Sequence, residues 1–135
     1  MKKHILILFL LMTVLYSCSS DDEGVANSQI QINPPSWIQG TWFLEGSEIE
    51  SGYKFTSNDF IIINLNIESS QRQQLKLFSG VDSDVEVSAL DSSSENSYSI
   101  TLNFPGTSFN YTFDRISDTE IQSTTIGVTA IYVKQ

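Results

Sequence analysis

The stretch Tyr98-Ser-Ile-Thr-Leu-Asn-Phe104-Pro-Gly-Thr-Ser-Phe109-Asn-Tyr-Thr-Phe113 decides the fold of this 135-residue chain. Apolar and polar side chains alternate strictly up to Phe104, and the alternation returns from Phe109 to Phe113. A period of two places all the apolar side chains on one face of a strand. Pro105-Gly106, between the two runs, is a tight-turn pair. The stretch therefore predicts an antiparallel hairpin with one buried face.

The same rhythm of short β-branched and aromatic runs between turn residues continues along the chain. No stretch keeps an apolar period of 3.6 residues, so we expect little helix. The runs predict strands over 40–46, 52–57, 59–67, 73–79, 84–90, 97–104, 108–115, 118–124 and 128–134. Strands of this number and length suit an all-β domain, either a sandwich or a small antiparallel up-and-down barrel of about eight strands. We expect the barrel, since closure removes the exposed sheet edges.

The N-terminus has the order of a secretory signal. Lys2 and Lys3 precede an apolar run over 5–16, and Ser17 precedes Cys18. Twelve apolar residues are too few to span a bilayer. The segment resembles the lipobox of bacterial lipoproteins, which implies a signal peptide over 1–17, cleavage before Cys18, and a lipid anchor (palmitate or a similar acyl chain) on that cysteine. The alternative is a plain secretion signal that leaves Cys18 as a free thiol.

Residues 18–36 are predicted to be the acylated cysteine followed by an acidic flexible linker. The cluster Asp21-Asp22-Glu23 opens the linker, Pro34-Pro35 close it, and its apolar content is low. The cluster resembles tags that send some lipoproteins to the outer face of the outer membrane, so we expect the protein in that membrane, facing the cell surface. The alternative is a solvated spacer. Residues 37–135 form the predicted domain.

Charge and composition exclude several functions. From Cys18 onward five basic residues face all 16 acids of the chain, so the net charge is 5 − 16 = −11. Such a surface repels nucleic acid. This part of the chain has no histidine and one cysteine, which excludes Ser-His-Asp and Cys-His catalysis and zinc sites of the histidine and cysteine type. Nucleotide-binding glycine motifs are absent. We expect neither an enzyme nor a cofactor or metal, with the membrane as partner through Cys18.

A family resemblance begins at Trp37-Ile-Gln-Gly40-Thr-Trp42, which looks like the G-x-W signature that opens lipocalin-like domains. Residues 110–124 and 131–135 are similar to the closing strands of small bacterial lipocalin-like (calycin-type) lipoproteins. The resemblance implies a barrel plugged at one end by Trp42. It also implies a basic residue from a late strand over that indole, either Lys134 or Arg115. The alternative is that Trp42 is a core aromatic on an ordinary strand.

Aromatic residues in the alternating runs are the candidate ligand contacts, because in a barrel they point inward. The proposed ligand-binding residues are Tyr53, Phe55, Tyr98, Tyr111 and Phe113, and Phe104 and Phe109 share their pattern. An eight-stranded barrel is filled by side chains or holds one small ligand. Side chains this large make a filled core the default, and it is the lipocalin-like resemblance that implies a lipoprotein that binds a small apolar or amphipathic molecule. The alternative is an accessory protein whose filled barrel presents loops, such as 91–96, to a protein or a glycan.

Two groups of carboxylates add further candidates. Asp82, Asp84 and Glu86 would share one face of a strand, where they could hold calcium or form a solvated polar surface. Glu48 and Glu50, with Glu45, could form the acid–base set of a hydrolase. In a chain with 16 acids such neighbours also arise by chance.

Overall fold

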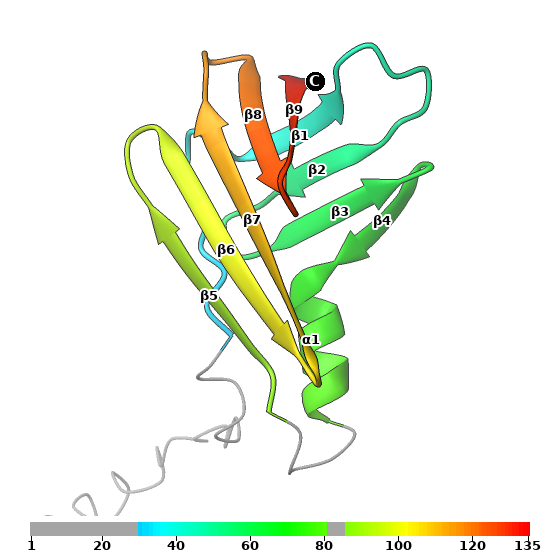
Figure 1. Cartoon of the computed structure of the whole chain (residues 1–135), viewed down its shortest axis with the longest axis vertical. Helices are drawn as coiled ribbons and strands as arrows, with labels where there is room; N and C mark the ends of the chain where they lie inside the picture. Colours follow the sequence, from blue (N-terminus) through cyan, green and yellow to red (C-terminus); the bar gives the residue numbers. More distant parts are fainter. Residues whose placement is uncertain (1–29, 81–85) are drawn as a thin grey trace, which may run out of the picture.

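A computed structural model describes residues 30–80 and 86–135, which form nine strands and one helix (Figure 1). The first four strands are β1 (Gly40–Leu44), β2 (Gly52–Phe55), β3 (Phe60–Asn64) and β4 (Ile67–Ser70). The helix α1 (Gln71–Ser79) follows β4 directly. The remaining strands are β5 (Ser88–Ser93), β6 (Ser97–Phe104), β7 (Thr107–Arg115), β8 (Glu120–Thr125) and β9 (Val128–Lys134).

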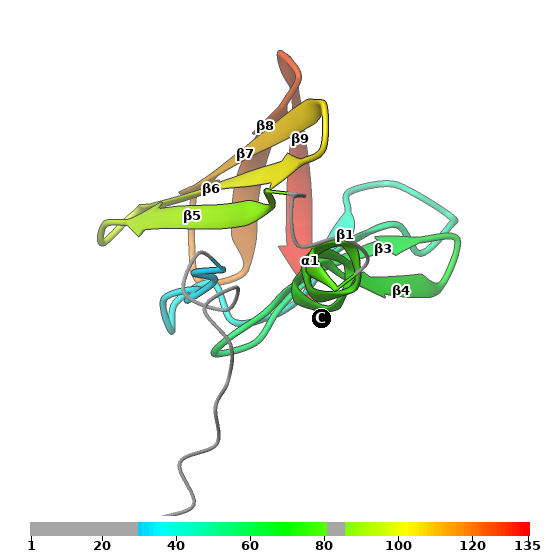
Figure 2. The same ribbon diagram turned by 90° about the horizontal axis from the view of Figure 1, so that it is seen from below.

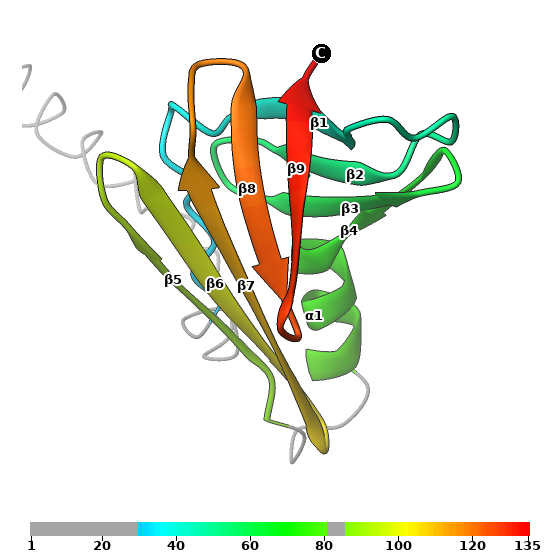
Figure 3. The ribbon, with the colours of Figure 1, turned by 45° about the horizontal axis from the view of Figure 1, so that its top comes forward.

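The strands form one antiparallel sheet in the order β4-β3-β2-β1-β9-β8-β7-β6-β5. The first and last strands pair with each other, and the sheet is open between β4 and β5. The sheet curls into a half-barrel (Figures 1 and 3), and from below its two halves appear as two layers with α1 beside β4 (Figure 2). The all-β, antiparallel prediction is confirmed, whereas the predicted closure into a barrel is not found: the described residues form nine strands in a sheet that stays open between β4 and β5.

The hairpin predicted from the central stretch is present. Strands β6 and β7 pair along their whole length, from Ser97 with Asp114 to Phe104 with Thr107. Pro105 and Gly106 form the two-residue turn, and Gly106 has a φ of 75° that favours glycine. The alternating burial of β6 follows its alternating sequence.

The predicted strand over 73–79 is wrong, because these residues belong to α1. The alternation of Leu75 and Leu77 imitates a strand, but good helix formers surround these residues and no β-branched residue interrupts them. Ser70 caps the helix by accepting a hydrogen bond from the Gln73 backbone N–H at 3.0 Å. The Asp59 carboxylate accepts a second one from the Arg72 N–H at 3.1 Å.

Residues 30–36 pack against the domain, although the sequence assigned them to the flexible linker. Ile30 and Ile32 are buried in the core. The Gln31 N–H donates to the Ala89 carbonyl of β5 at 2.8 Å, and Arg72 Nη2 of α1 donates to the Ile32 carbonyl at 3.2 Å. This segment therefore joins β5 to α1 across the open side of the sheet. Two apolar side chains in a polar stretch are enough to dock it.

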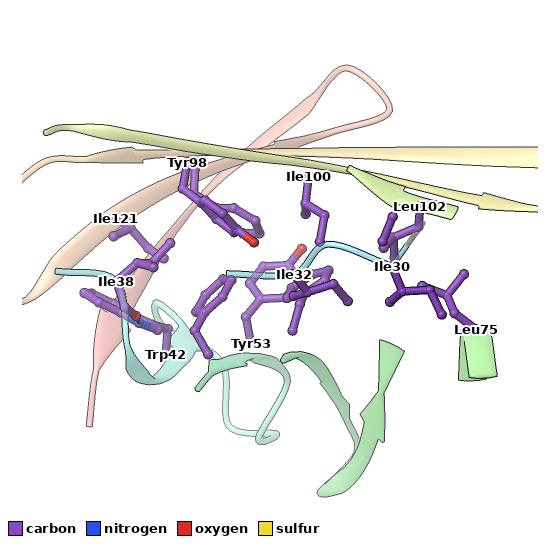
Figure 4. Packing of buried hydrophobic residues seen from close by; sticks show 14 of the residues in the cluster. Ile30, Ile32, Ile38, Trp42, Tyr53, Leu75, Tyr98, Ile100, Leu102 and Ile121 are labelled. Atoms are coloured by element: carbon purple, nitrogen blue, oxygen red, sulfur yellow. Dashed lines mark hydrogen bonds between the residues drawn. The ribbon is translucent and has the colours of Figure 1, made fainter. Parts of the chain in front are cut away.

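A single apolar core fills the half-barrel (Figure 4). Trp42, Ile38 and Ile121 lie at one end of it, and Leu75, Ile30 and Leu102 lie at the other. The expected burial of Trp42 is confirmed, since its side chain is fully buried and its indole N–H donates to the Ile38 carbonyl at 2.6 Å. The rest of the cluster consists of Ile32, Tyr53, Phe55, Phe60, Val87, Ala89, Tyr98, Ile100 and Phe113.

Candidate functional site

Four of the five predicted ligand contacts fill the interior. Tyr53, Phe55, Tyr98 and Phe113 are buried and touch one another. The ring centroid of Phe113 lies 5.0 Å from those of both Tyr53 and Phe55 and 6.3 Å from that of Tyr98. Edge-to-face and offset stacks at these distances are the favoured geometry of packed aromatic side chains. Phe55, Tyr98 and Phe113 are therefore core residues in this structure.

The fifth predicted contact, Tyr111, is half-buried and lines a groove between β3, β4 and α1 on one side and the β6–β7 hairpin on the other. This end groove has a volume of about 470 Å³. It is lined by Ile62, Asn64, Leu65, Ile67, Ser69, Gln71, Gln74, Phe104, Phe109 and Tyr111. The volume falls within the range of small-molecule sites.

A smaller depression of about 200 Å³ adjoins the end groove on β3, because both are lined by Ile62 and Asn64. Its other lining residues are Leu44, Ser51, Gly52, Tyr53, Ile63 and Tyr132. Tyr53 thus reaches the surface here, although only 8% of the residue is exposed. The two hollows bring Tyr53, Tyr111 and Tyr132 into one cluster, in which the ring of Tyr53 lies 4.8 Å from Tyr132 and 6.3 Å from Tyr111.

The rim of the end groove is apolar and exposed. Leu65 is 60% and Ile67 is 70% exposed. Leu65 and Asn66 form the β3–β4 turn with positive φ angles, which breaks the predicted strand 59–67 into two strands. Across the groove, the ring centroids of Phe104 and Phe109 lie 6.2 Å apart. The aromatic hairpin tip and the apolar turn thus face the same opening.

Burial raises the pKa of two tyrosines of this cluster, Tyr111 and Tyr132. It raises the pKa of Tyr111 above its ordinary value, and the neighbouring Tyr53 raises it further. The pKa of Tyr132 is also raised, first by burial and then by interaction with the Tyr53 hydroxyl. A raised tyrosine pKa means that the hydroxyl stays protonated at neutral pH and donates hydrogen bonds.

The opposite end of the core carries the contact expected from the G-x-W signature. Lys134 Nζ lies 5.1 Å from the centroid of the Trp42 ring, and the two residues pair across β9 and β1. Arg115 instead lies over Trp37, at 5.9 Å. Of the two basic residues proposed for this position, Lys134 is the one that occupies it.

The structure brings one group of carboxylate candidates together, since Glu45, Glu48 and Glu50 line a hollow of about 350 Å³ at the β1–β2 loop. Glu45, Glu48 and Glu50 are exposed in the β1–β2 loop. No group of three histidine, cysteine, aspartate or glutamate side chains suited to a metal occurs in the described ranges. Asp82 and Asp84 lie outside those ranges, and Glu86 is exposed.

The lipid-attachment residue Cys18 and the acidic cluster 21–23 also lie outside the described residues. Within residues 30–80 and 86–135, no helix combines the length and the apolar character of a membrane span.

Sequence reasoning missed several residues of the end groove. Ile62 stands in the non-alternating run 60–63, where the pattern does not show which side chains face inward. Gln71 and Gln74 stand in or beside the stretch that was expected to be a strand. Tyr132 follows the alternation of β9, and its pairing with Ile121 on β8 places it on the inner face. The alternation in β9 was the one feature of the sequence that could have identified Tyr132 as a residue of this site.

No family model, no curated protein and no solved structure matches this chain.

Proposed function

We propose that this protein is a lipoprotein with a lipocalin-like half-barrel, anchored through Cys18 in the bacterial outer membrane and facing the cell surface. We further propose that it binds a small apolar or amphipathic molecule in the end groove and has no enzymatic activity. The end groove carries the binding proposal, because it combines a ligand-sized volume with aromatic and aliphatic walls and a few polar side chains.

Two features support the lipocalin-like part of the proposal. The first and last strands pair, as they do in an up-and-down barrel. Lys134 lies over Trp42 in the way that the resemblance implies. Both are features of architecture, and the ligand must be inferred from the groove itself.

Binding in the end groove differs from binding in a central cavity. The aromatic side chains of β2, β3, β6 and β7 occupy the middle of the half-barrel and contact one another. A ligand placed there would have to displace several buried rings, each of which stabilises the fold by several kcal/mol on an order-of-magnitude scale. The open end groove accepts a ligand without that cost.

A dye titration tests the binding site. The chain from Ser19 to Gln135 contains the whole described core, which runs from Ile30 to Ile121, and circular dichroism checks that it is folded. We expect the uncharged dye N-phenyl-1-naphthylamine to give a saturable rise in fluorescence. Phe109→Ala should weaken binding by about tenfold, since it removes one wall of the groove.

The matched control is Ile116→Ala, which shortens an exposed apolar side chain in the β7–β8 turn, outside the groove. Ile116→Ala should bind the dye as the parent chain does. A folded parent chain without saturable dye binding would contradict the binding proposal.

The exposed rim favours a second function, that of an interaction protein. Leu65 and Ile67 are large apolar residues that are mostly exposed to solvent, and exposed apolar patches often mark protein interfaces. A protein partner would cover them by burying a much wider area than a small ligand does. Failure of dye binding together with capture of a partner that is lost in Ile67→Asp would favour this alternative.

The anchor is tested separately. Cys18→Ala should abolish labelling of the protein by a radioactive fatty acid, because the acyl chains attach to that thiol. Equal label in the variant would exclude Cys18 as the attachment site. Replacing Asp21, Asp22 and Glu23 with alanine should protect the protein from protease added to intact cells, whereas a simple spacer would leave it sensitive.

A further inference from the structure

The end groove is uncharged, although the chain is strongly acidic. Neither the end groove nor the adjoining depression is lined by an aspartate, glutamate, lysine or arginine side chain. The polar lining residues are Ser51, Asn64, Ser69, Gln71 and Gln74, all of which are neutral. The chain as a whole has a net charge of −9. The lining of this site is therefore neutral in a protein whose surface elsewhere is rich in carboxylates.

Two charged side chains on the flanking elements have polar partners of their own. Lys54 Nζ, on β2, contacts Glu68 Oε1, on β4, at 3.0 Å. The guanidinium of Arg72, on α1, donates to the carbonyls of Asn58 and Ile32. An ionised ligand group in the groove would lose its hydration without gaining an opposite charge among the lining residues, which is costly.

Two buried hydroxyl groups on β8, neither of which lines the end groove, have no hydrogen-bond partner within the described residues. They are Ser123 Oγ and Thr125 Oγ1, both on β8. Thr125 is the direct cross-strand partner of Tyr111, a lining residue of the end groove. Ser123 is only 2% exposed and pairs with Phe113 in the same register. Directly opposed residues of an antiparallel pair project from the same face of the sheet.

Buried hydroxyls without a partner are rare in folded proteins, since each costs free energy. Their neighbours on this face include Tyr111 and Tyr132, whose hydroxyls are neutral donors and acceptors at physiological pH. The site thus offers several hydroxyl groups and no charge. It matches a ligand that brings a hydroxyl group of its own.

Resting on the function proposed above, we infer that the end groove selects an uncharged amphipath with a hydroxyl group at its polar end, such as a single-chain alcohol. The hydroxyl lies at the tyrosine cluster, beside Tyr111, and the apolar chain lies along Phe104, Phe109 and Ile67. This orientation covers the exposed rim with the chain of the ligand.

Competition against the bound dye tests this inference. The competitors are octan-1-ol, octanoate and octylammonium, which share a chain length and differ in charge at neutral pH. Octan-1-ol should displace the dye at a concentration at least about tenfold lower than either ion, because only the ions bury an unpaired charge. Equal displacement by all three would overturn the inference and leave the proposed function intact. Absence of dye binding would contradict the proposed function itself.

A variant tests the position of the hydroxyl. Tyr111→Phe keeps the ring and removes its hydroxyl, so octan-1-ol should bind about five- to tenfold more weakly while dye binding is retained. The control is Thr101→Val, on the face of β6 that points away from the core. Unchanged octan-1-ol affinity in Tyr111→Phe would overturn the proposed position. Retained dye binding shows that each variant is folded.

Discussion

Lys134 lies over the indole of Trp42, with its Nζ 5.1 Å from the ring centroid, and joins the last strand to the first. Gly40, beside this contact, has a φ of 126° that favours glycine, and a Cβ there would lie 2.9 Å from Lys134 Cε. The buried Trp42 also donates its indole N–H to the Ile38 carbonyl. These contacts close one end of the core and leave the end groove as the opening at the other.

The Lys134–Trp42 contact should be measurable in the free energy of unfolding. Lys134→Met keeps most of the aliphatic stem and removes the charge, so the loss should be about 0.5–2 kcal/mol. Trp42→Ala should cost about 3–5 kcal/mol, since it empties a fully buried site. Urea denaturation gives both values. Lys76→Met, at an exposed position of α1, is the control and should cost at most about 0.5 kcal/mol. Equal losses in the two lysine variants would contradict a specific role for Lys134.

Gly52 should tolerate no side chain. A Cβ there would lie 2.0 Å from the Trp42 carbonyl oxygen, which is fixed in the β1–β2 ladder. Gly52→Ala should therefore lower the free energy of unfolding by about 3 kcal/mol or more. Gly80→Ala, at the end of α1, meets its nearest atom at 3.5 Å and has a φ of −87°, so it should cause no loss. Thermal unfolding of both variants measures these losses. A Gly52→Ala variant as stable as the parent chain would show that β1 and β2 are not as close at this position as the structure has them.

Ile32 tests whether residues 30–36 belong to the domain. Ile32→Ala should reduce the free energy of unfolding by about 2–5 kcal/mol, because the side chain is fully buried. Gln31→Ala is the matched control, since Gln31 is exposed and contributes its backbone N–H. A flexible linker would instead make both substitutions neutral.

Tyr98 should make stability depend on pH in the alkaline range. Burial, and then the charge of Asp91 and its hydrogen bond at 3.2 Å, raise the pKa of Tyr98 far above the ordinary value of 10.0. Because the folded-state pKa is above the unfolded one, its contribution to stability is complete below pH 10. It is lost as the pH rises further, by about 1.4 kcal/mol per pH unit.

Tyr98→Phe should remove this loss and flatten the fall of stability above pH 10. The variant should be less stable near neutrality by about 1 kcal/mol, since the hydrogen bond to Asp91 is missing. Urea denaturation at a series of pH values measures both effects. An equally steep fall in the variant would assign the pH dependence to other groups.

The alternation of apolar and polar residues predicted strands correctly where one face of the strand is buried and the other is exposed. β6 follows that rule from Tyr98 to Leu102, whereas in β7 Phe113 is buried and Phe109 is exposed. The rule failed at Leu75 and Leu77, where a nine-residue helix with one buried leucine also produces two apolar residues two positions apart. Local propensity and the Ser70 cap were the competing signals, and they agree with the helix.

The site could be predicted only in part. Alternation identified inward-facing aromatic residues such as Phe55 and Phe113, and the structure shows them packed together. Whether inward-facing rings meet one another or line a hollow depends on how the sheet closes. The sequence does not specify that closure, since the alternation of residues does not show that the sheet stays open between β4 and β5. Of the predicted contacts, Tyr111 is the one that lies at the edge of the aromatic core and lines the end groove.

The central claim is that the end groove binds an uncharged amphipath, and mapping of amide chemical shifts during a titration tests it most directly. Octan-1-ol is added to isotope-labelled chain from Ser19 to Gln135. We predict saturable shifts confined to residues of the groove and the neighbouring strand β8, with Ile62, Phe109, Tyr111 and Thr125 among the largest. Saturable shifts centred on the β1–β2 loop or on 91–96, or the absence of saturable shifts in the folded chain, would contradict the claim.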